Sequence, residues 1–333
     1  MSELYPLKFE TVLKEKVWGG NALVTHYNKK PAVSTCIGES WELSAVADNQ
    51  SVISNGFLAG NNIEEIIEVY MGDITGDSIY EKFGNEFPLL IKFIEAREDL
   101  SIQVHPGNDL SRKRHNAYGK TEMWYILESE KGTKIYTGFN DGVTREIYTE
   151  AINNGKLANL LNIEYVEAGD TFFTPAGRIH AIGAGTVLVE IQQTSDITYR
   201  IFDWNRKTSG KEKRELHTEL ALDAIDFSAT GNSKIRKEPE LNISVNLVSC
   251  EFFNTNIIRL NSTINKEFYL NDSFVVYICI EGEFLIQWDE SSEKVTKGET
   301  VLLPAMIKEI KLEPIGEALM LEIFVDSENS ILK

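Results

Sequence analysis

The chain has 333 residues, of which 42% are hydrophobic and 25% are charged, and its formal net charge is −18. This length and composition are typical of a soluble globular protein with one large core or roughly two to three smaller ones. The acidic excess argues against a nucleic-acid backbone or an anionic membrane surface as a partner, but it allows a small anion that binds to a local basic cluster.

No secretory leader is expected at the N-terminus, because residues 1–6 lack a basic segment followed by an apolar one. No apolar run approaches the length of a membrane span. The three cysteines, Cys36, Cys250 and Cys279, are far apart in the sequence and form no CxxC pair. These features together predict a cytoplasmic protein with buried free thiols.

Short β-like runs separated by turn residues fill most of the chain. Helical spacing of apolar residues interrupts them at about 61–72, again at about 142–161, and again at about 215–226. Between the first two of these segments, residues 89–94 form a strong apolar strand that leads into a second strand at 101–105. The sequence therefore predicts a mainly β fold with small helical additions.

An internal repeat is visible. Ala168–Ala176 (AGDTFFTPA) matches Lys297–Ala305 (KGETVLLPA), and Met123–Leu127 resembles Val275–Cys279. A glycine, an acidic residue and a threonine ahead of a Pro-Ala turn, flanked by short strands, are typical of a jelly roll of the cupin type. We therefore expect two cupin-type β-sandwich modules.

The module boundaries follow from composition. Residues 229–240 are rich in polar and turn residues and are expected to form a linker. Residues 1–228, which contain the three helical segments, form the first module, and residues 241–333 form the second.

Four side chains of the first module form a candidate metal site. Gln103 and His105 are two apart on an expected strand, so both point to one face. Glu122 opens the next apolar run, and His180 follows a turn at 174–177. Each residue alone is more often a satisfied core side chain, but an unpartnered imidazole inside an apolar strand costs free energy. Two imidazoles, a carboxylate and an amide oxygen together suit a catalytic divalent metal.

The second repeat provides an internal comparison. Counting from the shared Pro-Ala pair, Glu309 takes the place of His180. Counting from the shared tyrosine, Phe274 takes the place of Glu122, and no Gln-x-His precedes it. The ligand residues are therefore not simply required by the fold, and the second module is expected to be free of metal.

Cations accompany the candidate ligands. Lys92 lies inside the apolar run 89–94, where a charge needs a partner or a cavity. Lys120 is two residues from Glu122 on an extended segment, so the two side chains should share a face.

Further polar residues follow on the next two strands. Glu190 and Gln192 are also two residues apart on an expected strand, so their side chains should share a face. Arg200 and Arg206 follow them in the sequence. For Arg206, beside Lys207, an ordinary surface charge is an equally good interpretation. A metal, buried carboxylates and several cations together favour a small anionic substrate, and a sugar phosphate fits best.

The chain resembles class I mannose-6-phosphate isomerase (phosphomannose isomerase), a family of the cupin superfamily. The resemblance is carried by Leu90–Pro106, Gly119–Glu122 and Pro175–Ala181, and it extends from Val17–Gly20 and Gly38–Glu42 to the C-terminal module. The span from Glu122 to His180 is too short for the large helical insertion of longer members. The chain is therefore similar to the compact bacterial form.

The resemblance implies an enzyme with one Zn²⁺ per chain that interconverts mannose 6-phosphate and fructose 6-phosphate. It implies that the zinc ligands are Gln103, His105, Glu122 and His180. Arg200, ten residues after Glu190, matches an arginine implicated in catalysis. Ser101, Lys92 and Lys120 match positions near the substrate. Arg206 stands where longer members tend to have a lysine. Trp18 and the pair Trp41–Glu42 match segments of the compact form and are expected near the pocket.

This reaction moves a proton between C2 and C1 of the sugar through a cis-enediol, so a base must accept and return the proton. Glu190, Lys120 and a hydroxide on the metal are all candidates, while a Lewis-acid metal and Arg200 could stabilise the oxyanion. The alternatives are a cupin isomerase or epimerase of another sugar phosphate, and a sugar-binding cupin without catalysis. Zinc in place of iron or manganese is implied by the resemblance alone, because a mixed nitrogen and oxygen shell accepts several metals. We expect a monomer or a weak homodimer, with the substrate as its partner.

Overall fold

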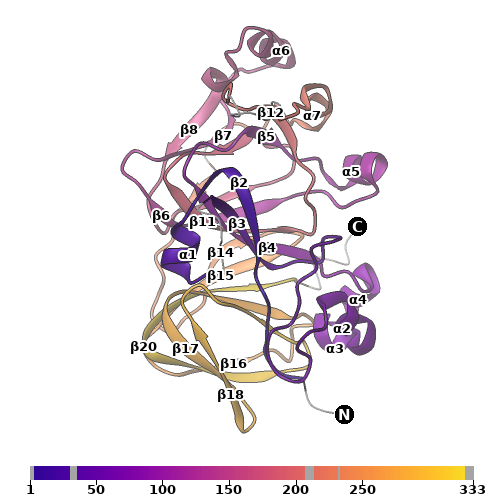
Figure 1. The fold of residues 1–333 in the computed structure, drawn as a ribbon, viewed down its shortest axis with the longest axis vertical. Coiled ribbons are helices and arrows are strands. Elements are labelled where there is room, and N and C mark those ends of the chain that lie inside the picture. The colour runs from indigo at the N-terminus through magenta and orange to yellow at the C-terminus, as the bar shows by residue number, and fades with distance from the viewer. Residues whose placement is uncertain (1–3, 31–35, 207–213, 232, 327–333) are drawn as a thin grey trace.

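The computed structural model describes residues 4–30, 36–206, 214–231 and 233–326 (Figure 1). Its strands form a seven-stranded, a five-stranded and an eight-stranded sheet. The first two belong mainly to the N-terminal part of the chain, and the third contains the yellow strands at the bottom of Figure 1. The expected mainly β fold with small helical additions is confirmed.

The first module is a sandwich of two sheets. The seven-stranded sheet contains, in spatial order, β13 (Lys234–Ile235), β9 (Thr171–Thr174), β6 (Glu122–Ser129), β11 (Thr186–Gln193), β4 (Leu89–Ala96), β3 (Ile37–Leu43) and β2 (Val12–Gly20). The five-stranded sheet contains β12 (Tyr199–Phe202), β5 (Ile102–Val104), β10 (His180–Ile182), β7 (Lys134–Phe139) and β8 (Leu161–Tyr165). Between the two sheets, apolar residues such as Trp124, Leu188 and Ile182 form a small core.

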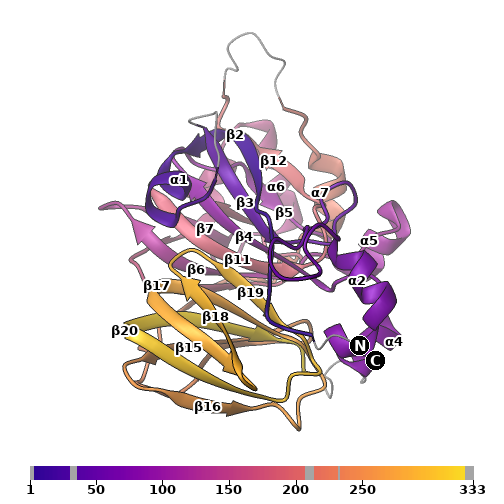
Figure 2. The same ribbon diagram turned by 60° about the horizontal axis from the view of Figure 1, so that its bottom comes forward.

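The second module is a single sheet that folds over its own core (Figure 2). Its strands are β1 (Leu7–Lys8), β14 (Val245–Ser249), β15 (Asn254–Leu260), β16 (Ile264–Glu267), β17 (Val275–Trp288), β18 (Ser291–Thr296), β19 (Thr300–Leu303) and β20 (Glu309–Phe324). The register of β17 against β20 shifts on both sides of Gly282. Gly282 has φ +70°, and an added Cβ would lie 2.0 Å from Glu317 O, so the bend requires glycine.

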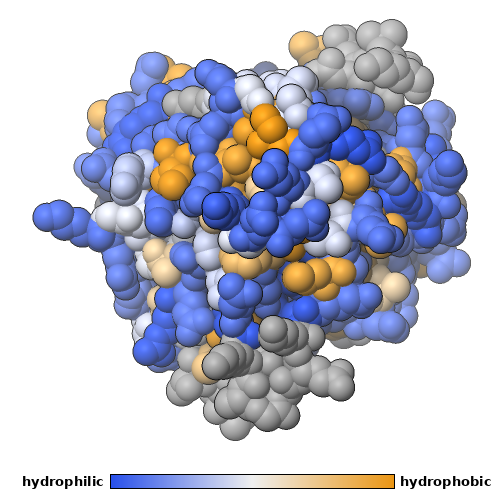
Figure 3. Space-filling model, turned by 90° about the horizontal axis from the view of Figure 1, so that it is seen from above, coloured by the Kyte–Doolittle hydropathy of each residue, from blue (hydrophilic) through white to orange (hydrophobic). Residues whose placement is uncertain are grey.

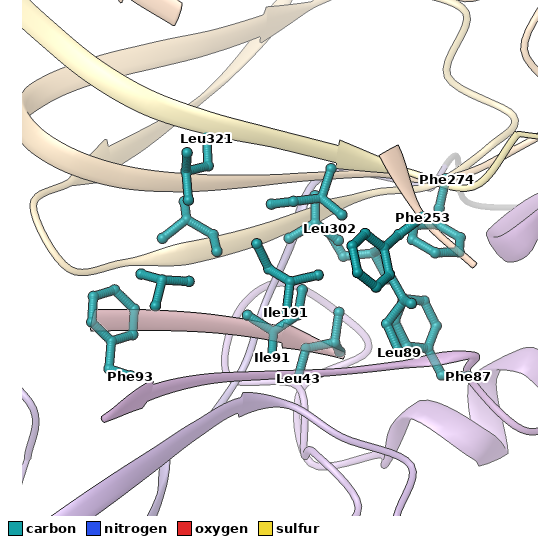
Figure 4. Packing of buried hydrophobic residues seen from close by; sticks show 14 of the residues in the cluster. Leu43, Phe87, Leu89, Ile91, Phe93, Ile191, Phe253, Phe274, Leu302 and Leu321 are labelled. Carbon is teal, nitrogen blue, oxygen red and sulfur yellow. The ribbon is translucent and has the colours of Figure 1, made fainter. Parts of the chain in front are cut away.

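The largest hydrophobic core lies between the two modules. Side chains on β4 and β11 alternate, so that Ile91, Phe93 and Ile191 point to the second module while Lys92 and Glu190 point the other way. Figure 4 shows these three apolar residues facing Leu302 and Leu321 of the second module, with Phe87, Phe253 and Phe274 packed beside them. The back of the first module's sheet is thus covered by the second module, and its front is left for a site.

The helices agree with the expected segments in part. The first segment contains α2 (Ile63–Tyr70), whereas α3 (Gly72–Thr75) and α4 (Asp77–Phe83) follow beyond it. The second contains α6 (Arg145–Asn153) and η1 (Leu157–Leu160), and the third contains α7 (Thr218–Ala224). Among the described helices, those that were not expected are α1 (Ala22–Tyr27), α3, α4 and α5 (Asn108–His115). The sequence of α5, NDLSRKRH, has a single large apolar residue, so it shows no helical apolar period.

The expected linker is partly a strand. Lys234 and Ile235 form β13 and pair with β9, while Lys234 and Arg236 bind Asp170 at 2.7 and 3.0 Å. These residues therefore belong to the sheet of the first module. In the opposite sense, β1 near the N-terminus pairs with β19 of the second module. Two short strands, β1 near the N-terminus and β13 in the expected linker, thus pair with sheets that the composition does not indicate.

The surface and the thiols are those of an ordinary globular protein. The face seen in Figure 3 is mostly hydrophilic, with small apolar patches. Among the described helices none is long and apolar enough to cross a membrane. Of the three cysteines, Cys279 is buried, Cys250 is half-buried and Cys36 is exposed, which corrects the expectation of buried thiols.

Candidate metal centre and active site

Three of the four expected metal ligands converge between the two sheets of the first module. The ligand atoms of His105, Glu122 and His180 all lie within 4.8 Å of one another. His180 Nε2 is 3.3 Å from Glu122 Oε1, and His105 Nε2 is 3.5 Å from Glu122 Oε2. All three side chains are buried. Glu122 begins β6 of the seven-stranded sheet, whereas His180 begins β10 and His105 directly follows β5 of the five-stranded sheet, so the cluster joins the two layers.

Both imidazoles are held with Nε2 toward the centre. His105 Nδ1 is 2.9 Å from Ile197 O, and His180 Nδ1 is 2.8 Å from Arg178 O. A carbonyl only accepts, so each Nδ1 donates and each Nε2 offers its lone pair to the centre. Burial lowers the pKa of His180 to about 4 and that of His105 well below its usual value, so both rings are neutral.

Unsatisfied lone pairs at this centre fit a cation. Within the described residues, neither His105 Nε2 nor Glu122 Oε1 makes a hydrogen bond, although both atoms are fully buried. Gln103 pairs with His180 in the strand register, and its Nε2 is 3.3 Å from His180 Nε2. Rotating this amide by half a turn would bring Oε1, a metal-ligand atom, to the same place. Two nitrogens and two oxygens suit a divalent metal.

A cavity of about 310 Å³ lies beside this centre, and it is lined by Gln103 and by Lys120, which binds Glu122. It is lined by expected residues, namely Trp18, Lys92, Ser101, Gln103, Lys120, Glu190 and Arg200. It is also lined by residues that the sequence analysis did not single out as site residues, namely Lys16, Glu39, Asp196, Thr198 and Arg214. The structure thus brings the expected catalytic and substrate-binding residues, apart from Arg206, to one cavity.

A larger cavity of about 770 Å³ lies elsewhere, between the two modules. Its buried charges, Lys29 and Glu42, form an ion pair with each other at 2.7 Å. Because neither charge is left to meet a ligand and no candidate metal ligand lines this space, we assign the chemistry to the smaller cavity.

The buried lysines both have partners, as expected. Lys92 Nζ donates to Glu190 Oε2 at 2.8 Å and to Gln192 Oε1 at 2.7 Å. Lys120 Nζ is 2.9 Å from Glu122 Oε2 and 3.9 Å from Glu190 Oε2. Alternating charges on neighbouring strands therefore form a continuous row along the cavity wall.

Glu190 is fully engaged by its neighbours. Its Oε1 accepts a hydrogen bond from Trp124 Nε1 at 3.0 Å, and its Oε2 accepts from Lys92. Burial alone would raise the pKa of Glu190, but Lys120 and Lys92 lower it to about 2. Glu190 is therefore ionised at neutral pH and a weak base.

The two expected arginines lie in different places. Arg200 pairs with Gln103 in the strand register and lines the cavity. Arg206 lies outside the cavity lining, where it donates to Asp99 O and is 3.4 Å from Asp203 and 3.6 Å from Glu98. The surface-charge interpretation of Arg206 fits this placement better than a substrate contact.

Arg214 takes a place in the cavity wall that the sequence analysis did not anticipate. Its Nε donates to Asp203 Oδ2 at 2.8 Å. Arg214 stands in a polar basic segment with no apolar alternation to place it, so the sequence carries no signal for this position.

Glu39 could have been found by strand alternation, starting from the expected Trp41. They are two residues apart on β3, like Lys120 and Glu122, and Trp41 Nε1 donates to Glu39 Oε2 at 2.8 Å. Both line the cavity, and Lys16 is 3.1 Å from Glu39. Glu42, the other member of the expected pair Trp41–Glu42, points to the opposite side, where it binds Lys29.

The described part of the second module has no equivalent ligands, but one assignment made from the sequence needs correction. The amide of Ile126 donates to Asp170 O, and in the second module the amide of Cys279 donates to Glu299 O in the same way. Ile126 therefore corresponds to Cys279, and the position of Glu122 is taken by Val275 rather than Phe274. The sequence match at the shared tyrosine is displaced by one residue, which reverses the face of every side chain.

The other ligand positions of the second module also follow from strand pairing. Glu309 begins β20 and pairs with Glu267, as His180 begins β10 and pairs with Gln103. Glu309 is exposed to solvent. Two solvent-facing carboxylates and a buried valine do not reproduce the buried centre of the first module.

A cupin sandwich with a buried His–Glu–His cluster beside a cation-lined cavity defines a cupin with a candidate divalent-metal site. The chain matches the family models phosphomannose isomerase type I, catalytic domain, over residues 6–137, and mannose-6-phosphate isomerase, cupin domain, over residues 243–322. Mannose-6-phosphate isomerase ManA of Bacillus subtilis is 33% identical over 321 residues, which cover 95% of this chain and 98% of that protein. The chain belongs to the type I phosphomannose isomerase family.

Two further comparisons agree. Mannose-6-phosphate isomerase of Streptococcus mutans is 31% identical over 310 residues, which cover 91% of this chain and 93% of that protein. The crystal structure of the mannose 6-phosphate isomerase from Bacillus subtilis matches with a TM-score of 0.84 at 27% identity, over 96% of this chain and 99% of that chain. The similarity therefore includes both modules.

Proposed function

We propose that this protein interconverts mannose 6-phosphate and fructose 6-phosphate. The single observation that carries the proposal is the buried cluster of His105, Glu122 and His180 at a cavity of about 310 Å³ with five cationic side chains in its wall. A cavity of this size is at the lower end of small-molecule sites and suits a phosphorylated hexose. Family membership supports the same reaction.

We assign the ligands of one Zn²⁺ per chain to Gln103, His105, Glu122 and His180. The neutral imidazoles, the buried carboxylate and the amide support this assignment, and zinc itself rests on family membership. When bound, the metal would supply Lewis acidity to the sugar's carbonyl and hydroxyl oxygens. The remaining chemistry belongs to the side chains of the cavity.

The cavity residues would carry a cis-enediol mechanism. Arg200 stabilises the negative charge that develops on oxygen, and Lys92, Lys120 and Ser101 orient the substrate. Glu190 and Lys120 are the protein candidates for moving the proton between C2 and C1. Glu190 is an ionised carboxylate, but both of its oxygens already accept hydrogen bonds. Burial lowers the pKa of Lys120 but Glu122 and Glu190 raise it above its usual value, so Lys120 is an ammonium that can donate a proton and cannot accept one. Trp18 forms part of the cavity wall.

The domain assignment is part of the proposal. Residues 1–228, together with the β13 strand, form the catalytic module, and residues 241–333 form a module without metal ligands that covers the back of the catalytic sheet. We place the protein in the cytoplasm, as a monomer or weak homodimer that binds a sugar phosphate and neither nucleic acid nor membrane.

The test is conversion of mannose 6-phosphate to fructose 6-phosphate by purified protein. We expect activity that is lost after metal removal and restored by Zn²⁺, with mannose a very poor substrate. Equal kcat/KM for mannose and mannose 6-phosphate would contradict the role of the cation cluster. Turnover of a different sugar phosphate in place of mannose 6-phosphate would favour the alternative isomerase or epimerase, and binding without turnover would favour a non-catalytic cupin.

A further inference from the structure

Two adjacent glutamines end strand β11, and both are buried. Gln192 is 0% exposed and Gln193 is 5% exposed. Glutamine is rarely buried, and a buried amide must have all of its polar atoms satisfied. Because consecutive strand residues point to opposite faces, the two amides reach different parts of the molecule.

Gln192 connects Lys92 to the chain that follows β11. Its Oε1 accepts from Lys92 Nζ at 2.7 Å, and its Nε2 donates to Gln193 O at 2.8 Å and to Ser195 O at 2.5 Å. The segment it holds leads directly to Asp196 and Thr198 in the cavity wall. A carboxylate could accept from Lys92 but could not donate to the two carbonyls, so this position requires an amide.

Gln193 holds the segment that carries Lys120 and Glu122. Thr121, which lies between them, donates its amide to Gln193 Oε1 at 3.0 Å and accepts from the Gln193 amide at 3.2 Å. Gln193 Nε2 donates to Asn108 Oδ1 at 3.1 Å, and the same oxygen accepts from the amide of Gly119 at 2.9 Å. Both sides of Thr121 are therefore fixed relative to β11.

We propose that Gln192 and Gln193 are positioning residues with separate roles in this active site. Gln192 sets the place of Lys92 in the cavity, and Gln193 sets the place of Glu122 relative to the histidines. The role of Gln192 rests on the proposed isomerase function, whereas the role of Gln193 concerns metal binding and stands without it. Neither side chain lines the cavity, so both act through the residue that they hold.

The test compares Gln192→Met and Gln193→Met, which keep the volume and remove the amide. We expect Gln192→Met to lower kcat/KM for mannose 6-phosphate about 10–100-fold with unchanged Zn²⁺ affinity, because outer partners of site residues typically contribute this much. We expect Gln193→Met to weaken Zn²⁺ binding about 10–100-fold, measured by competition with a chromophoric chelator. Gln192→Glu should be no more active than Gln192→Met, because a glutamate carboxylate cannot donate a hydrogen bond to Ser195 O.

Gln287→Met is the matched control, because Gln287 lies on β17 of the second module and bonds only Glu313 among the described side chains. It should leave both readouts unchanged. Equal loss of Zn²⁺ affinity in both variants, or changes no larger than those of the control, would overturn the proposal. If wild-type protein binds Zn²⁺ but does not turn over mannose 6-phosphate, the proposed function fails while the Gln193 experiment still gives its answer.

Discussion

Arg200 differs from the other cations of the cavity in having no carboxylate partner among the described residues. Each of the remaining four cations has a carboxylate partner. Lys16 pairs with Glu39, Lys92 with Glu190, Lys120 with Glu122, and Arg214 with Asp203. Within the described residues, the Arg200 guanidinium donates only to a backbone carbonyl, that of Glu215 at 2.9 Å, and its buried Nε makes no hydrogen bond. Its charge is therefore free to meet a negative charge that develops on the substrate.

Arg200→Ala should lower kcat far more than it raises KM. Loss of a group that stabilises a developing oxyanion typically costs about 10²–10³ in rate. Steady-state kinetics with mannose 6-phosphate measure this split. Arg200→Lys keeps the charge but loses the planar fork, so it should recover only part of the rate. An unchanged kcat with a raised KM would instead make Arg200 an anchor for the phosphate or a hydroxyl.

His180→Ala should remove most of the metal, while the wild-type protein binds about one ion per chain. The reason is that His180 supplies one of three buried ligand atoms, and Val275 and the exposed Glu309 leave the second module without a buried set. Elemental analysis of purified protein measures the content. His26→Ala is the control, because His26 is exposed and binds Glu128. Full occupancy in His180→Ala, or a second stoichiometric ion in the wild type, would contradict the assignment.

At the scale of the elements, the sequence predicts the strands of the site better than their register. Residue spacing places Gln103 with His105 and Lys120 with Glu122 correctly, because strand alternation has a period of two and needs no tertiary information. The match at Phe274 is displaced by one residue, which shows that residue spacing alone does not fix which residues of two strands correspond. Only the backbone hydrogen bonds of Cys279 fix which residue of β17 corresponds to Glu122.

The remaining differences have the same physical origin. β13 and β1 are too short to carry an alternating pattern, so their pairing with distant strands depends on tertiary contacts. α5 is held by polar contacts, such as Ser111 Oγ donating to Tyr118 O at 2.7 Å, and not by an apolar face. Arg206 is placed by Asp203 and Asp99, which no local pattern indicates.

Helix α4 of the first module is capped by an aspartate of the second. Asp272 accepts from the amides of Asp77 and Ser78, both at 2.9 Å, and from Ser78 Oγ at 2.6 Å. Burial alone would raise the pKa of Asp272, but these bonds and Lys308 lower it below its usual value. The folded protein therefore prefers the ionised carboxylate more than the unfolded chain does.

Asp272→Ala should destabilise the protein by about 1 kcal/mol at neutral pH, because it removes the cap. Since folding lowers the pKa of Asp272, this stabilisation is complete when the pH is above the pKa of the carboxyl in the unfolded chain. It is lost as the pH falls through the pKa of Asp272 in the folded protein. Urea unfolding of wild type and variant should thus differ at pH 7 and converge in strong acid. Asp141→Ala, at an exposed position, is the control. A difference that grew on acidification would contradict the charged cap.

At the scale of the whole molecule, the second module keeps the cupin scaffold and uses one face of it as a cover. Val276, Ile278 and Leu321 point to the first module, while Val275 and Tyr277 point into the second module's own core. The apolar face of the catalytic sheet therefore depends on the second module for its burial. Two modules that share one core are expected to unfold together.

Leu321→Ala tests this shared core. Leu321 is 0% exposed and lies opposite the back of the catalytic sheet (Figure 4). Removing a buried leucine side chain typically costs about 2–5 kcal/mol. We expect the urea midpoints for isomerase activity and for far-UV circular dichroism to move down together. Trp288 is the sole tryptophan of the second module, so Trp288→Phe combined with Leu321→Ala leaves fluorescence that reports the first module alone. A fluorescence midpoint that stayed at the wild-type value would show that the modules unfold independently.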